Sequence, residues 1–159
     1  MVGLRQRAWD AAATVVDPEI PVLTIEDLGV LRDVVVTGDR VEVAITPTYS
    51  GCPAMAMIAL DVETALARAG ISNARVITVL APAWTTDWMS AAGRQKLAAY
   101  GIAPPPASGR GGLFATQIVA CPRCWATDTE QLAEFGSTSC KALWRCRACR
   151  EPFDLFKCH

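Results

Sequence analysis

Histidine is almost absent from this sequence: the single one, His159, is the last of the 159 residues. Because nucleophilic cysteine catalysis normally needs a base beside the thiol, a hydrolase built on a Cys–His pair is disfavoured. A glycine-rich phosphate loop before a helix is missing too, since the glycines at residues 109–112 follow no expected strand. The sequence therefore does not favour an enzyme acting on a small substrate.

Long hydrophobic runs are also missing. The longest, at residues 55–60 and 79–84, are far too short to span a bilayer, and the N-terminus lacks the continuous apolar core of a signal peptide. We therefore expect no membrane association and a cytoplasmic location. In that reducing compartment, the seven cysteines are better explained by metal or thiol chemistry than by disulfides.

What the sequence does have is an uneven distribution of cysteines, six of which fall in the last 39 residues. They include two Cys-x-x-Cys pairs, here called hooks, which are Cys121–Cys124 and Cys146–Cys149 with 21 residues between them. This spacing is typical of a tetrahedral cage of four thiolates around zinc or iron. Such a closed site leaves no open coordination position, so its expected role is structural.

The residue that follows each hook departs from the usual pattern. A glycine or other small residue is common there, but this chain has Trp125 and Arg150. We therefore expect a distorted backbone at the two hook turns. Cys140, Cys158 or His159 could then replace or supplement a ligand, although packing or fraying at the chain end is the favoured interpretation of those three residues.

Net charge is −1, so no global field attracts nucleic acid. Residues 1–102 hold 8 Lys and Arg against 11 Asp and Glu, and residues 103–159 hold 7 against 5. Four of these seven cations gather around the second hook, and they are Lys141, Arg145, Arg147 and Arg150. A solvated turn is favoured over a nucleic-acid patch, because a nucleic-acid-binding domain is expected to have a basic pI.

A segment rich in proline and glycine, residues 103–112, is predicted to be a linker. It separates an N-terminal domain, residues 1–102, which is large enough to bury its own core, from a tail, residues 113–159. The tail is near the size at which apolar burial alone fails and a metal staple is expected. We therefore predict a zinc-ribbon-like module at the C-terminus.

Hydrophobic periodicity in the N-terminal domain predicts an α+β fold, a small three-stranded mixed sheet with packed helices. The two strands joined by Gly38–Asp39 should form an antiparallel hairpin, because the connecting loop has only two residues. In chain order the expected elements are a helix at 4–16, strands at 31–37 and 40–46, a helix at 53–69, a strand at 74–80, and a helix from 86 or 87 to 100.

The seventh cysteine, Cys52, stands between Gly51 and Pro53 where a helix should start. Unpaired N–H groups and the positive end of the helix dipole favour an anion at that position. The pKa of the thiol is therefore expected to fall to about 3.5–7.5, which would give a thiolate at neutral pH. The alternative is a buried, inert cysteine that packs as a small hydrophobic residue.

Other polar and aromatic positions carry weaker signals. Asp17 and Glu19 flank Pro18, and on residues alone they form a helix-terminating turn with solvated acids. Thr48 is an ordinary threonine at a strand end. Trp84 and Trp88 are expected in the core rather than in a stacking platform.

Several short motifs together resemble the small domain shared by SufT-like proteins and MIP-type cytosolic iron–sulfur assembly factors, over residues 4–102. They are Asp17–Pro21, Ile25–Gly29, Val34, Thr46–Thr48 and Gly51–Pro53. A longer set is similar to the PaaD family, encoded with the phenylacetyl-CoA ring epoxidase, and extends the resemblance over nearly the whole chain. That set is Thr46–Pro53, Trp84–Trp88, Phe135–Thr138, Lys141, Arg150–Phe153 and Lys157–His159.

The resemblance implies an accessory protein of phenylacetate degradation that assists maturation of the epoxidase and is not the oxygenase. The family's reactive cysteine corresponds to Cys52, and its acidic motif to Asp17 and Glu19. We expect Cys52 to hold a labile iron or iron–sulfur species, with these acids and Thr48 lining the site. The expected client is the ferredoxin-type reductase subunit or the diiron oxygenase subunit.

A single thiol cannot satisfy a cluster, so a second ligand is expected from another protomer, as in a homodimer, from a small thiol or from the tail. Two further functions stay open at this point. One is a non-catalytic structural subunit of the epoxidase that docks through its ribbon. The other is a zinc ribbon that binds nucleic acid, whose affinity should depend steeply on salt.

Overall fold

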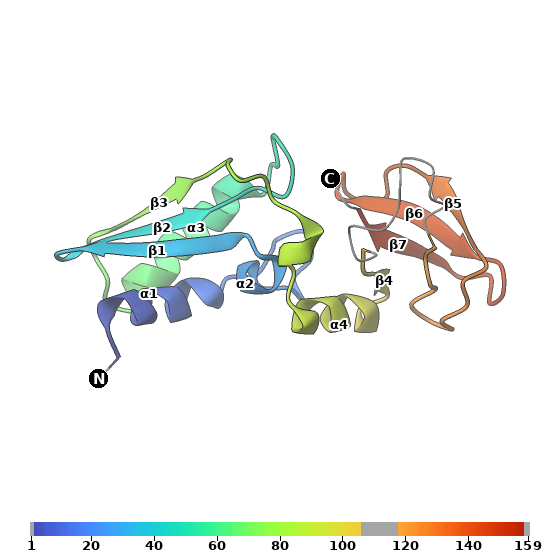
Figure 1. The fold of residues 1–159 in the computed structure, drawn as a ribbon, viewed down its shortest axis with the longest axis horizontal. Coiled ribbons are helices and arrows are strands. Elements are labelled where there is room, and N and C mark those ends of the chain that lie inside the picture. The colour runs from blue at the N-terminus through green and yellow to red at the C-terminus, as the bar shows by residue number, and fades with distance from the viewer. Residues whose placement is uncertain (1, 106–117, 158–159) are drawn as a thin grey trace. The chain divides into compact units, whose positions relative to one another are not determined.

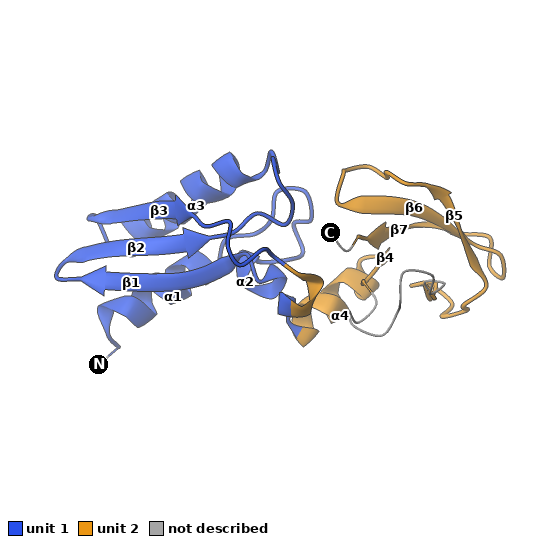
Figure 2. Cartoon of the chain, turned by 45° about the horizontal axis from the view of Figure 1, so that its top comes forward, with its two compact units in different colours: residues 1–84, 88–90 blue, residues 85–87, 91–159 orange. Residues whose placement is uncertain are grey.

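The computed structural model describes residues 2–105 and 118–157. The chain divides into two compact units, one of residues 1–84 and 88–90 and the other of residues 85–87 and 91–159 (Figure 2). The sequence placed this boundary after residue 102, whereas here residues 91–103 group with the tail. Most of the predicted linker, residues 106–112, lies outside the described part of the chain.

The first unit is the predicted mixed sheet with helices packed against it (Figure 1). β1 (Leu31–Thr37) and β2 (Arg40–Ile45) are antiparallel, and β3 (Ala74–Thr78) runs parallel to β2. α1 (Leu4–Ala13) and α3 (Met55–Arg68) contact the sheet and each other. The α+β fold class and the two-residue hairpin at Gly38–Asp39 are thus confirmed.

The core of this unit follows the alternation expected from the sequence. Val41, Val43 and Ile45 of β2 are 0% exposed, because period-2 spacing places them on the face that the helices cover. On α3, the buried residues Ile58, Val62 and Leu66 recur at helical spacing. No helix in the described residues is both long and apolar enough to cross a membrane.

The end of α1 and the start of α3, which lie next to the thiol-site residues in the sequence, differ from the prediction. α1 stops at Ala13 instead of continuing to Val16, which forms an isolated bridge with Thr24. α3 begins at Met55, with Ala54 as its N-cap, two residues later than the expected start at Pro53. Cys52 therefore lies in the turn before the helix rather than at its cap.

A short helix that the sequence analysis missed, α2 (Ile25–Leu28), follows the acidic turn. Thr24 and Asp27 form a capping box, in which the N–H of Asp27 donates to Thr24 Oγ1 at 3.0 Å and the N–H of Thr24 donates to Asp27 Oδ2 at 3.2 Å. The Thr-x-x-Asp spacing is a local signal for such a start. One turn of helix has too few residues for a hydrophobic period to reveal it.

The second unit is a four-stranded sheet of order β4-β7-β6-β5, preceded by a helix. A single 3-10 turn (Thr86–Trp88) comes before α4 (Ala91–Ala99), so the last helix begins later than expected. The strands are β4 (Ile102–Ala103), β5 (Thr129–Ala133), β6 (Lys141–Cys146) and β7 (Pro152–Phe156). Ala103, assigned to the linker by its sequence, is 1% exposed and pairs with Leu155.

Candidate metal centre and thiol site

The two hooks bring four sulfur atoms together in the second unit. The Sγ atoms of Cys121, Cys124, Cys146 and Cys149 all lie within 4.8 Å of one another. The separations Cys121–Cys149 and Cys124–Cys146 are 3.7 and 3.5 Å. Zinc bonds of about 2.3 Å to sulfur in a tetrahedron imply sulfur–sulfur edges of about 3.8 Å. The donor set and its spacing therefore fit a tetrahedral metal ion.

Backbone hydrogen bonds shape the hooks as two similar turns. In the first hook, the N–H of Trp125 donates to the carbonyl of Cys121, and the N–H of Cys121 donates to the carbonyl of Ala126, both at 2.9 Å. In the second, the N–H of Cys146 donates to the carbonyl of Glu151 at 2.9 Å. Each turn places its two sulfur atoms on the same side, as a shared cation requires.

The expected distortion of the hook turns is not observed. Trp125 and Arg150 take φ angles of 63° and 65°, the left-handed region in which glycine is normally found after such a hook. Both large residues thus accept the turn geometry instead of changing it. The conformation costs a residue with a Cβ atom about 1–2 kcal/mol, and a metal ion bound by the four sulfurs would supply ample free energy to maintain it.

The sulfurs cannot all ionise at neutral pH without a cation. The N–H of Cys149 donates to Cys146 Sγ and, with further hydrogen bonds, lowers the pKa of Cys146 to about 7. The N–H of Glu151 lowers the pKa of Cys149, but burial and the neighbouring cysteine sulfurs raise it overall to about 12. A metal ion would supply the positive charge that keeps all four as thiolates.

Cys140 is separate from the four-cysteine cluster. It is 4% exposed, and its sulfur lies 2.9 Å from Thr138 Oγ1. This agrees with the packing role that the sequence favoured for it. The predicted alternatives Cys158 and His159 lie outside the described residues.

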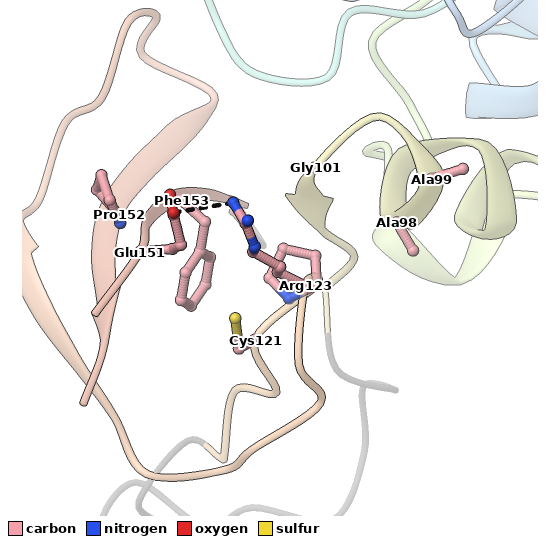
Figure 3. Close-up of a pocket in the computed structure, with 9 residues that line it drawn as sticks. Ala98, Ala99, Gly101, Cys121, Arg123, Glu151, Pro152 and Phe153 are labelled. Atoms are coloured by element: carbon pink, nitrogen blue, oxygen red, sulfur yellow. Dashed lines mark ion pairs between the residues drawn. The ribbon is translucent and has the colours of Figure 1, made fainter. Parts of the chain in front are cut away.

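A cavity of about 360 Å³ lies beside the first hook (Figure 3). Its walls come from the end of α4 and from the ribbon, and they are Ala98, Ala99, Gly101, Cys121, Pro122, Arg123, Glu151, Pro152 and Phe153. At its edge, Arg123 Nη1 lies 2.8 Å from the Glu151 carboxylate. This ion pair links the first hook to the strand after the second, although its exposure limits its contribution to about 0–1 kcal/mol.

In the first unit, Cys52 sits in a tight turn between β2 and α3. Gly51 has a φ of 76°, which supplies the sharp turn predicted from the sequence. The N–H of Cys52 donates to the carbonyl of Tyr49 at 3.2 Å, and its own carbonyl accepts from Met55 at 3.4 Å. The Cys52 side chain is half-buried, and it forms no disulfide with any cysteine among the described residues.

The prediction of a low thiol pKa is wrong. Burial raises the pKa of Cys52, and the negative charges of Glu19 and Asp17 raise it further. Hydrogen bonds from the N–H of Ala54 and the hydroxyl of Tyr49 oppose the shift without reversing it. Because α3 starts three residues after Cys52, its dipole does not offset the burial and the two acids, and the thiol is neutral at pH 7.

The charges of both predicted acids act on the pKa of the thiol. Asp17 is 9% exposed, and its Oδ1 accepts hydrogen bonds from the N–H groups of Glu19 and Ile20, each at 2.8 Å. The interpretation of solvated acids therefore fails for Asp17, which folds the turn around its own carboxylate. Both charges act on the Cys52 pKa, so the residues of this turn and the thiol share one electrostatic site.

The sequence predicted a role at this site for Thr48 but none for Tyr49. Thr48 is partly buried after β2, and within the described residues no hydrogen bond joins its side chain to Cys52, Asp17 or Glu19. Tyr49, which received no role from the sequence, has a hydroxyl group that hydrogen-bonds the thiol. Its place in the motif from Thr46 to Pro53 was the available signal.

The tryptophan pair belongs to the packing of the first unit. Trp84 is 4% exposed, and its Nε1 donates to the carbonyl of Leu28 at 2.8 Å, as expected for a core residue. Trp88 is half-buried beneath the guanidinium of Arg32, 3.5 Å from the ring centre. A Cβ atom on Gly29 would lie 2.6 Å from Trp88, so only glycine fits there.

Comparison with known proteins identifies both units. The family described as iron–sulfur cluster assembly protein matches residues 5–79, and the PaaD zinc beta ribbon domain matches residues 105–157. A domain of unknown function (DUF59) from Bacillus anthracis has a TM-score of 0.55 at 26% identity, over 58% of this chain and 90% of that one. A conserved hypothetical protein from Thermotoga maritima has a TM-score of 0.51 at 30% identity, over 60% and 94%.

Two relatives of this chain carry functional names. An "Fe-S protein maturation auxiliary factor" of Porphyromonas gingivalis is 38% identical over 79 residues, which is 48% of this chain and 74% of that protein. A protein of Escherichia coli K12 named as a subunit of "putative 1,2-phenylacetyl-CoA epoxidase" is 47% identical over 150 residues, 94% of this chain and 90% of that protein. With an assembly domain followed by a PaaD ribbon over nearly its whole length, the chain belongs to the PaaD family of phenylacetyl-CoA epoxidase subunits.

Proposed function

We propose that this protein is an accessory subunit that delivers iron or an iron–sulfur species to another subunit of phenylacetyl-CoA epoxidase in aerobic phenylacetate degradation. The observation that supports the proposal is that the charges of Asp17 and Glu19 act on the Cys52 thiol, in a domain of the iron–sulfur assembly family. The protein is not itself the oxygenase. Its only histidine is His159, so no base is available to a thiol nucleophile from that residue type in the first unit.

The chemistry of the Cys52 site favours a cationic cargo. Two carboxylates raise the pKa of the thiol, and the same negative field attracts a metal cation. When iron binds the sulfur, the thiol proton leaves, because the thiolate is the form that ligates metal. Thr48 lines this site in our proposal, and a further ligand comes from a second protomer, a small thiol or the tail.

The four cysteines of the hooks hold a structural metal ion in this proposal. All four positions of a tetrahedral site are filled by protein sulfur, so no position remains for a substrate. Zinc is favoured by the likeness to the PaaD zinc beta ribbon domain, and iron is the alternative in the same donor set. The ion would supply much of the free energy that folds this small unit.

The proposed client is the ferredoxin-type reductase subunit or the diiron oxygenase subunit. The name of the Escherichia coli relative supports a partner within the epoxidase, and the iron–sulfur assembly family supports a client that carries iron. In this proposal the protein works in the reducing cytoplasm, where a thiol such as Cys52 stays reduced.

One observation favours a second candidate, a structural subunit that docks without carrying metal. The Cys52 thiol is half-buried and its pKa is raised, which are also the properties of a cysteine that only packs. In that case the ribbon would serve as the docking module. The two candidates differ in what happens when Cys52 is replaced.

The experiment compares epoxidase produced with wild-type protein, Cys52→Ser and the control Cys140→Ser, purified anaerobically. Iron and acid-labile sulfide are measured in each separated subunit. The delivery function predicts that with Cys52→Ser one client subunit is present at normal yield but deficient in iron, while Cys140→Ser gives a fully loaded client. A fully loaded client with Cys52→Ser would refute delivery and leave the structural subunit.

A further inference from the structure

The residues that follow the two hooks occupy a backbone position that glycine fills without strain. Trp125 and Arg150, here called the knuckle tips, have φ angles of 63° and 65° in that left-handed region. Each is adjacent in sequence to a sulfur of the four-cysteine cluster, Cys124 and Cys149, and those sulfurs lie within 4.8 Å of each other. Strained residues that persist are concentrated where the side chain has a function.

Both knuckle tips have exposed side chains. Trp125 is 64% exposed although it is the largest type of apolar side chain. Arg150 is exposed and, in the described part of the chain, forms no ion pair or hydrogen bond through its side chain. Packing and ion pairing inside the ribbon therefore do not explain why these two residues are present.

Positive charge surrounds Arg150. Together with Arg145, Cys146 and Arg147 it lines a hollow of about 340 Å³. Arg145 and Arg147 already pair with the carboxylate of Glu130. Arg150 is thus the cation in this hollow whose charge is left for an external anion.

We propose that the knuckle tips form the surface by which the ribbon docks on the client subunit of the epoxidase, at a site with a carboxylate-bearing segment beside an apolar depression. Arg150 pairs with the carboxylate and Trp125 enters the depression. Tryptophan and arginine are the residue types that most often dominate the binding energy of protein interfaces. This inference rests on the proposed function for the existence of a client, and it concerns a different surface from that of Cys52.

Protein is favoured over nucleic acid as the partner. The chain has a net charge of −1, and the other two arginines of the hollow are paired with Glu130. Nucleic-acid interfaces need many free cations to neutralise phosphates. One unpaired arginine and one exposed tryptophan, each following a cysteine of the same cluster, match a mixed polar and apolar protein surface better.

The test measures binding of the full-length, metal-loaded protein to the purified reductase and oxygenase subunits, each immobilised separately, at several salt concentrations. The variants are Trp125→Gly and Arg150→Gly, with Leu80→Ala and Arg68→Ala as controls that remove an exposed apolar side chain and an exposed cation in the first unit. The glycine variants relieve backbone strain, so a loss of binding cannot come from unfolding. Chelator resistance of the metal and the melting temperature are measured in parallel.

We expect wild type and both controls to bind one of the two subunits, and each glycine variant to raise its Kd about tenfold or more. Arg150→Gly should also flatten the salt dependence, whereas Trp125→Gly should keep it. The inference is overturned if the glycine variants bind like wild type, if wild type binds neither subunit, or if RNA is bound instead. It is also overturned if Arg150→Gly loses its metal, because the arginine would then only balance the charge of the cluster.

The result separates this inference from delivery by Cys52. Cys52→Ser should dock with the affinity of wild type and still leave the client deficient in iron. Normal docking with glycine at both tips refutes the docking surface alone. A fully loaded client with Cys52→Ser refutes delivery alone.

Discussion

The hook turns allow a prediction of unusual sign, in which replacing two large residues by glycine stabilises the ribbon. Trp125 and Arg150 hold left-handed φ angles of 63° and 65°, and relief of that conformation is worth about 1–2 kcal/mol at each position. Glycine loses about 0.4–1 kcal/mol of this through the greater entropy of the unfolded chain. The net gain is about 1 kcal/mol for each substitution. At about 4–8 °C per kcal/mol for a unit of this size, the ribbon of the double variant should melt about 8–16 °C higher.

The assay is thermal unfolding of the full-length, metal-loaded protein, in which release of the metal to a coloured chelator reports unfolding of the ribbon and circular dichroism reports unfolding of the first unit. Gly38→Ala serves as the control for backbone strain, because Gly38 has a φ of 65° and a Cβ atom there would meet no atom within 4 Å. That variant should lose about the same 1 kcal/mol in the first unit. If Gly38→Ala behaves as expected while both knuckle variants melt at or below the wild-type temperature, the strain argument at the hooks is wrong.

Two further predictions concern the cysteines. Cys146→Ser, or removal of the metal, should unfold the ribbon and leave the first unit folded, because structural zinc contributes on the order of 10–16 kcal/mol in small domains. Limited proteolysis combined with circular dichroism measures which unit stays folded. A ribbon that remains protected from the protease would contradict the prediction. Alkylation of Cys52, followed by mass spectrometry, should be slow at pH 7 and accelerate with pH, since only the thiolate reacts and burial with Glu19 and Asp17 raises the thiol pKa. Glu19→Gln and Asp17→Asn should speed the reaction at pH 8 by lowering that pKa, with rates converging above both pKa values; equal rates at pH 8 would show that the acids do not act on the thiol.

The metal centre was predictable because each hook is specified by a few residues that are neighbours in the sequence. Two cysteines separated by two residues form a turn that aims both sulfurs the same way, so the spacing of Cys121–Cys124 and Cys146–Cys149 is enough to predict the cluster. The hairpin of β1 and β2 was equally accessible, since alternation and a two-residue loop specify both strands. In each case the sequence pattern spans few residues, and the geometry of the turn determines which two groups come together.

The pKa of Cys52 was not predictable for the opposite reason. The sign of the shift depends on burial by the surrounding fold and on two carboxylates more than thirty residues earlier in the chain. It also depends on where α3 begins, and a start at Met55 instead of Pro53 is enough to remove Cys52 from the helix cap. Helix ends are among the least certain features of a sequence pattern.

A raised pKa at Cys52 agrees better with a delivery role than the low value expected from the sequence. A metal must displace the thiol proton, so each pH unit by which the pKa exceeds the ambient pH weakens the apparent affinity about tenfold. A permanent thiolate at a helix cap would hold iron more tightly and release it more slowly. At the hooks the pKa of Cys146 is lowered to about 7 and that of Cys149 is raised to about 12, so ease of deprotonation does not by itself explain why that site would retain its ion. Four protein sulfurs within 4.8 Å of one another can act on one ion together, whereas Cys52 offers a single sulfur that must first lose its proton. In the delivery proposal, the number of protein ligands and the protonation of the one thiol therefore act in the same direction, toward release at Cys52 and retention at the hooks.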